Sequence, residues 1–87
     1  MKLNKDFVTY KVDSEDILIC LDSNKFSGVI KMNNTAAFIV SLLSEDTDCD
    51  AVLAELIDKY SGATPEDMRR DMDEVISLLS SVGAIDK

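Results

Sequence analysis

The sequence predicts an α+β fold in which a three-stranded antiparallel β-meander is followed by three helices, a winged-helix-like arrangement. Three short segments with strand-like apolar patterns occupy the first 32 residues, and two segments with clear helix start and stop signals occupy the second half. Between them, at Asn33, the hydrophobic period changes from two residues to that of a helix. A chain of 87 residues has room for one core, so we expect residues 1–87 to form a single domain.

The three predicted strands are joined by short polar turns. Phe7–Val12 alternates, with Val8, Tyr10 and Val12 on one face. Ile17–Leu21 is apolar at every position, so we predict that it is the middle strand and is covered more completely than its neighbours. Short connections make successive strands pair antiparallel, which leaves the third strand at an edge of the sheet. This third strand is predicted at Phe26–Met32.

The first predicted helix, Asn34–Ser44, is apolar almost all round and should therefore be buried. Asn33 is its predicted N-cap. The second helix is predicted to start with Thr47 as cap, with Asp50 completing a capping box, and to end before Gly62. Its predicted core stripe contains Cys49, Val52, Leu53, Leu56, Ile57 and Tyr60.

The third helix has Thr64 as predicted cap and Pro65 at the first helical position, and it should end near Val82, before Gly83. Leu78 lies outside its core stripe, on a flank shared with Asp71 and Val82. This flank has two interpretations: an ordinary exposed apolar residue, or one wall of a groove for a partner. The predicted core stripe contains Met68, Met72, Val75, Ile76 and Leu79.

The composition excludes several classes of protein. The net charge of −8 disfavours nucleic acid and anionic membranes as partners, and the longest apolar run of five residues is far below the about 20 that span a bilayer. We expect a cytoplasmic protein, because Met1–Asp6 lacks the apolar region of a signal peptide. There is no histidine and no zinc-ligand spacing, so we interpret Cys20 and Cys49 as structural thiols, with Cys20 buried; a disulfide between them does not follow from sequence.

We find no constellation of catalytic residues in the sequence. Asp46–Asp50 resembles a calcium loop, but Ala51 and Ile57 stand where an EF-hand needs Gly and Glu, so helix-start carboxylates explain the cluster. No nucleophile elbow, phosphate-binding loop or dinucleotide fingerprint occurs, which predicts that the chain is not an enzyme and holds no metal or cofactor. DNA binding by a winged helix is disfavoured because acidic residues outnumber Arg69 and Arg70 on the last helix.

The order of elements and two motifs resemble the coenzyme PQQ synthesis protein D (PqqD) family. In the first motif, Met32–Ile39, an apolar residue and Asn lead through Thr and small residues into an apolar helix. In the second, Arg70–Met72 precedes an apolar pair, a Leu and Gly83. The resemblance runs from about Lys5 to Ile85.

Two positions depart from the family pattern: Val40 stands where Trp is frequent, and Ala84 where Leu usually follows the Gly. The resemblance implies a non-catalytic peptide chaperone, a recognition element for ribosomally synthesised and post-translationally modified peptides (RiPPs). It implies that a precursor's leader peptide is held as a strand added to the third β-strand, beside the last helix, and presented to a modifying enzyme, commonly a radical SAM enzyme. The expected peptide-binding residues are Phe26, Ser27, Gly28, Val29, Ile30, Lys31, Asp71, Val75, Leu78 and Val82.

The pattern of residues agrees with strand addition, because the third strand is an edge and Gly28 would let another backbone approach. The alternative is an edge that is merely solvated and protected by Lys31. A second function also stays open, namely a structural or regulatory module that recognises a folded protein surface and has no leader-peptide role. An exposed edge leaves both a monomer and a homodimer possible.

Overall fold

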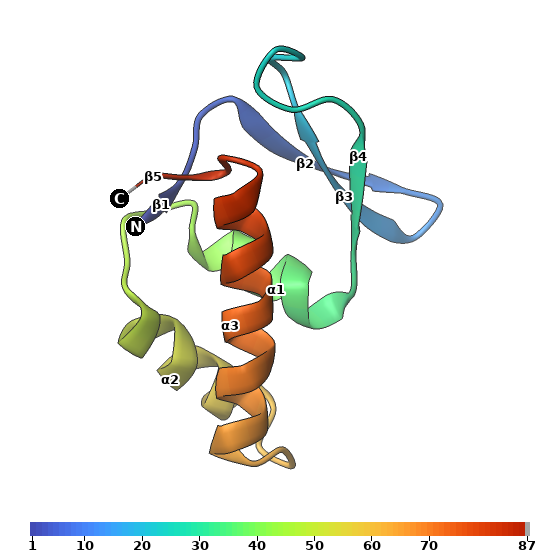
Figure 1. Cartoon of the computed structure of the whole chain (residues 1–87). Coiled ribbons are helices and arrows are strands. Elements are labelled where there is room, and N and C mark those ends of the chain that lie inside the picture. Colours follow the sequence, from blue (N-terminus) through green and yellow to red (C-terminus); the bar gives the residue numbers. More distant parts are fainter. Residues whose placement is uncertain (87) are drawn as a thin grey trace.

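The structure, a computed structural model, describes residues 1–86 and contains the predicted strands and helices in the predicted order (Figure 1). A pair of short strands at the chain ends was not predicted. The elements are β1 (Lys2–Leu3), β2 (Phe7–Val12), β3 (Glu15–Cys20), β4 (Val29–Met32), α1 (Asn34–Leu42), α2 (Cys49–Lys59), α3 (Pro65–Ser81) and β5 (Ile85–Asp86).

The main sheet is antiparallel with strand order β2-β3-β4, which confirms β3 as the middle strand and β4 as an edge. Leu18 of β3 is fully buried and pairs with Ile30 on the core side of the sheet. The prediction that the middle strand extends to Leu21 is wrong. Leu21 follows the last residue of β3 and is 65% exposed; its N–H donates to the Asp6 carbonyl, on the β2 side, at 2.6 Å.

The outer face of this sheet is also apolar. Val8, Tyr10 and Val12 share one face as predicted, but this face points away from the core, and Tyr10 and Val12 are exposed. The residue that anchors β2 in the core is Phe7, on the opposite face. Alternation therefore identified which residues of β2 share a face. It did not identify the buried face, because the more apolar face is the outer one.

Capping explains where the helices begin. The Asn33 side chain accepts a hydrogen bond from the Ala36 N–H at 2.8 Å, as predicted, and Thr64 caps α3 in the same way. The predicted cap of α2 is wrong: Asp48, not Thr47, caps this helix. The Thr47 N–H donates instead to the Met1 carbonyl at 2.8 Å, which holds Thr47 in the extended segment before the helix.

Helix α1 lies between the sheet and the α2–α3 pair, and it packs against β3, β4, α2 and α3 (Figure 1). Gly83 follows α3 with φ +77°, the left-handed conformation predicted for this position. From the predicted stripe of α2, Cys49 and Ile57 are exposed. The buried hydrophobic residues are Phe7, Leu18, Ile39, Val40, Leu43, Val52, Leu56, Met68, Met72, Leu79 and Ala84. No helix within residues 1–86 is long and apolar enough to cross a membrane.

The turn between β2 and β3 gives a stability prediction. Asp13 and Ser14 have φ of 51° and 68°, the pattern of a type I′ hairpin that favours Gly at the second position. Ser14→Gly should remove left-handed strain of about 1–2 kcal/mol at an entropic cost of about 0.5–1 kcal/mol. We therefore expect thermal unfolding to show a net gain of about 0.5–1 kcal/mol, or about 2–8 °C in Tm. Ser14→Ala is the control, and an equal gain from Ala would contradict the strain argument.

Candidate functional site

The candidate site is the free edge of β4, and this strand is shorter than predicted. The strand comprises Val29–Met32, so the prediction that Phe26–Gly28 are part of it is wrong. Two features explain this. Gly28 has φ +115°, which lies outside the extended β region, and the β3–β4 ladder ends at the Ile19–Val29 pair, so residues 26–28 have no partner strand.

The segment before β4 is held in place by two side chains. The Phe26 ring lies 6.4 Å from the Phe7 ring and packs at the border of the core. Lys25 Nζ donates to Asp6 Oδ2 at 3.0 Å and to Asn4 Oδ1 at 3.2 Å. The hydrogen bond to Asp6 raises the pKa of Lys25 above its ordinary value, because it stabilises the charged ammonium.

Lys25 was missed by the sequence analysis, because its partners are distant in sequence and no local pattern marks them. The stem of its side chain also passes over the end of α3, where a Cβ added to Gly83 would lie 3.7 Å from Lys25 Cγ. Lys25 thus connects the segment before β4 to the N-terminal segment and to the end of α3.

The two faces of β4 differ as the alternation predicted. Ile30 and Met32 point to the core side, while Val29 is 58% exposed and the Lys31 side chain 77% exposed. Within residues 1–86, no strand pairs with β4 on the side opposite β3. The edge therefore has backbone groups available for another strand, and the space around Gly28 is open.

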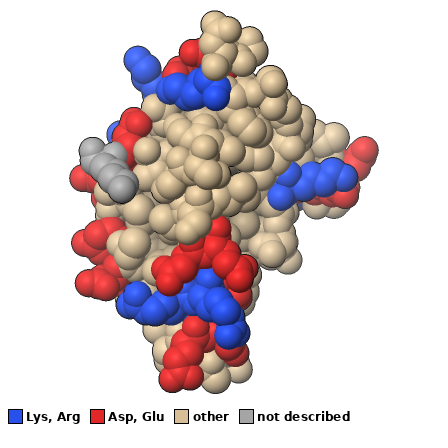
Figure 2. Space-filling model, in the orientation of Figure 1, with Lys and Arg blue, Asp and Glu red and all other residues tan. Residues whose placement is uncertain are grey.

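The flank of α3 that could form one wall of a groove is partly buried and partly exposed. Val75 and Val82 are half-buried against the core, Asp71 is half-buried, and Leu78 is 47% exposed. Helix α1 packs against both α3 and β4, and so fixes the two surfaces relative to each other. Figure 2 shows a face without charged side chains over the C-terminal half of α3 and toward β4, whereas charges crowd the other end of α3.

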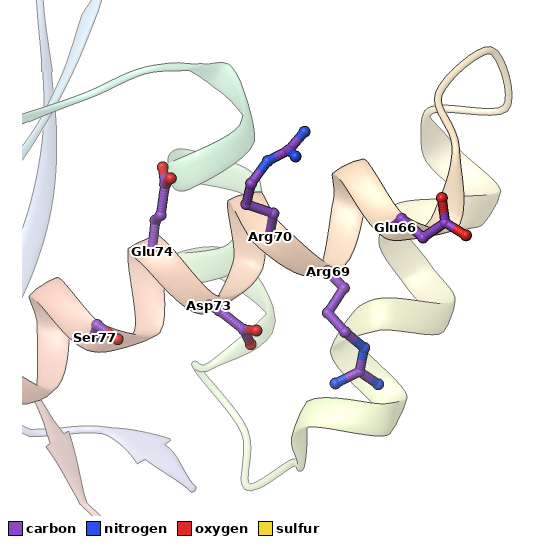
Figure 3. A pocket seen from close by; sticks show the side chains of 6 residues that line it. All are labelled: Glu66, Arg69, Arg70, Asp73, Glu74 and Ser77. Atoms are coloured by element: carbon purple, nitrogen blue, oxygen red, sulfur yellow. The ribbon is translucent and has the colours of Figure 1, made fainter.

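A hollow on the outside of α3 is too open to be an alternative site. All of its lining residues come from this one helix, and their side chains diverge: Arg70 and Glu74 project from one side, Arg69 and Asp73 from the other (Figure 3). Arg70 pairs with Asp67 one turn earlier, an ordinary ion pair of a helix surface. Side chains that point apart from a single helix cannot enclose a substrate.

The remaining candidates for chemistry are metal-ligating side chains and cysteine thiols. No three His, Cys, Asp or Glu residues gather as metal ligands in the part of the chain that the structure describes. Cys20 and Cys49 are free thiols; Cys49 is exposed, and Cys20 is half-buried rather than fully buried as expected.

Within residues 1–86, the free edge of β4 and the α3 flank with Leu78 are connected through α1, and a free antiparallel edge defines a class of small α+β proteins suited to binding an extended chain. The chain belongs to the coenzyme PQQ synthesis protein D (PqqD) family, whose model matches residues 9–85. A similar solved structure is TbiB1 in complex with the TbiA(beta) leader peptide. It has a TM-score of 0.78 and 20% sequence identity, and the match covers 97% of this chain and 93% of that chain. No curated protein sequence matches the chain.

The contacts of Lys25 give a second prediction. Lys25→Met removes both hydrogen bonds from Nζ, so we expect faster exchange of the amides of residues 25 and 26, which both donate to the Asp22 carbonyl, measured by NMR, with the β2–β3 amides unchanged. Lys31→Met is the matched control, because the Lys31–Glu15 pair is exposed and 3.7 Å long. Equal exchange in the two variants would show that Lys25 does not hold this segment.

Proposed function

We propose that the chain binds the leader of a ribosomally synthesised precursor peptide by β-strand addition and presents it to a modifying enzyme. The observation that supports this most directly is the edge of Val29–Met32, which no strand of residues 1–86 covers, together with the exposed side chain of Leu78 on α3, a helix that packs on α1 as β4 does. Membership of the PqqD family and the similarity in fold to TbiB1, whose structure holds a leader peptide, support it further.

In this proposal, affinity and selectivity have different sources. Backbone hydrogen bonds to the β4 edge give affinity for many extended sequences, because every residue except Pro offers the same N–H and C=O. Alternate leader side chains point toward Val75, Leu78 and Val82, where apolar contact gives selectivity. Asp71 borders this contact, Ser27 and Gly28 continue the backbone surface, and Phe26 supports it from the core.

The proposed role is that of a non-catalytic peptide chaperone in the cytoplasm, with no cofactor of its own. Its partners are the precursor peptide and a modifying enzyme, for which we propose the radical SAM class. The dispersal of nucleophilic and ligating side chains in residues 1–86 agrees with a role in binding. We propose residues 1–87 as a single recognition domain.

A structural or regulatory module without a leader role is the second candidate. The observation that favours it is the apolar outer face of β2, where Tyr10 and Val12 are exposed. Titration with synthetic leaders of short precursor reading frames beside this gene distinguishes the two. A leader peptide should bind the parent protein, while absence of binding by every such leader would favour the second candidate.

Leu78 provides the third prediction. Leu78→Asp places a charge in the proposed apolar contact, so isothermal titration should show binding of the leader weakened by about 1–3 kcal/mol, or about 5- to 150-fold. Because Leu78 is 47% exposed, Tm should change little.

Ile57→Asp is the matched control for this variant, since Ile57 is also an exposed apolar residue but lies on α2. It should bind the leader as tightly as the parent. If Leu78→Asp is folded and also retains parental affinity, α3 does not contribute to the peptide site.

A further inference from the structure

We propose that Val29 and Lys31 select leaders by the side chains that point outward from the sheet, away from α3. The selected class is an extended segment in which a β-branched or aromatic residue and an acidic residue are separated by one residue. This inference rests on the proposed addition of the leader to β4, and it concerns the half of the leader's side chains that the α3 flank does not contact.

The register of the sheet defines two rows of side chains on its outer face. Val29 pairs with Ile19, and Lys31 pairs with Ile17. On the far side of β3, Ile19 pairs with Val8 and Ile17 with Tyr10. We call these the Val29 row (Val8, Ile19, Val29) and the Lys31 row (Tyr10, Ile17, Lys31). A strand added to the free edge continues both rows, because cross-strand neighbours on one face lie about 4.5–5.5 Å apart.

The Val29 row selects an apolar residue. Val29 ends this row and is 58% exposed, although Val8 and Ile19 are half-buried. A β-branched or aromatic leader residue beside Val29 would cover its open side and remove apolar surface from water. A charged residue at the same position would have only apolar neighbours in the row.

The Lys31 row selects an acidic residue. Lys31 is the charged residue of β4, and its ammonium lies 3.7 Å from a carboxylate oxygen of Glu15, which is on the β3 side. Both side chains are exposed, so this pair is weak and the free-edge side of Lys31 remains accessible. An acidic leader residue there would place a carboxylate on each side of Lys31, whereas a basic residue would be repelled.

The spacing follows from the alternation of strands. Val29 and Lys31 are two residues apart on β4, so the two leader residues beside them are also two apart, whichever direction the leader runs. The leader residue between them points to the opposite face, toward the flank with Leu78. The net charge of −8 repels an acidic side chain from the surface as a whole. Binding of an acidic leader residue at this position therefore depends on Lys31.

The experiment selects binders from a displayed library of random 12-residue peptides, using the full chain and its Lys31→Glu, Lys31→Gln and Leu78→Asp variants. For the parent, we expect enriched peptides with an apolar and an acidic residue separated by one position. Lys31→Glu should enrich a basic residue at the acidic position, and Lys31→Gln should lose the charge preference. An individual peptide should bind Lys31→Glu about 2- to 5-fold more weakly, with recovery when its acid is replaced by Lys.

Three outcomes would overturn the proposal, and they separate it from the proposed function. In the first outcome, the enrichment disappears with Leu78→Asp but is identical for the parent and Lys31→Glu. This result rejects only the selection by Val29 and Lys31. Enrichment unaffected by Leu78→Asp and by Lys31→Glu rejects both this selection and the α3 contact. No enrichment of any peptide by the folded parent rejects peptide binding itself. Circular dichroism of each variant establishes that it is folded.

Discussion

The burial of α1 between the sheet and the other two helices is the interaction on which the rest of the structure depends. Ile39 of this helix is fully buried, together with Leu18 of the sheet and Met72 of α3. Truncation of such a side chain costs about 2–5 kcal/mol, a large part of the about 5–15 kcal/mol that stabilises a typical domain. The same contacts fix β4 relative to α3, so the geometry of the site depends on the core.

Features set by local chemistry were predictable from sequence. Caps at Asn33 and Thr64 and the left-handed Gly83 depend on interactions within a few residues, and all three were predicted correctly. The cap of α2 was not, because Thr47 and Asp48 are both good caps and the choice depends on a hydrogen bond to Met1, far away in sequence. The β1–β5 pair was missed because two-residue strands have no detectable period.

The candidate site was predictable in part. Strand order followed from short connections, so the β4 edge was found, but its start was placed too early because alternation continues through Phe26 and Gly28. Only the structure shows that the β3–β4 ladder ends at the Ile19–Val29 pair and leaves that segment unpaired. Likewise, alternation separates the two faces of a strand but does not say which one is buried. In β2 the buried face is the one with Phe7, although the opposite face has three apolar residues.

The central claim is that a leader peptide becomes an additional strand on β4, although β2 forms the other edge of the same sheet. Isotope-filtered NMR of the labelled chain with an unlabelled leader tests this claim most directly. The account predicts cross-strand backbone contacts between the leader and Val29–Met32, together with side-chain contacts to Leu78. Backbone contacts to Phe7–Val12 instead, or contacts to side chains without any backbone pairing, would contradict it.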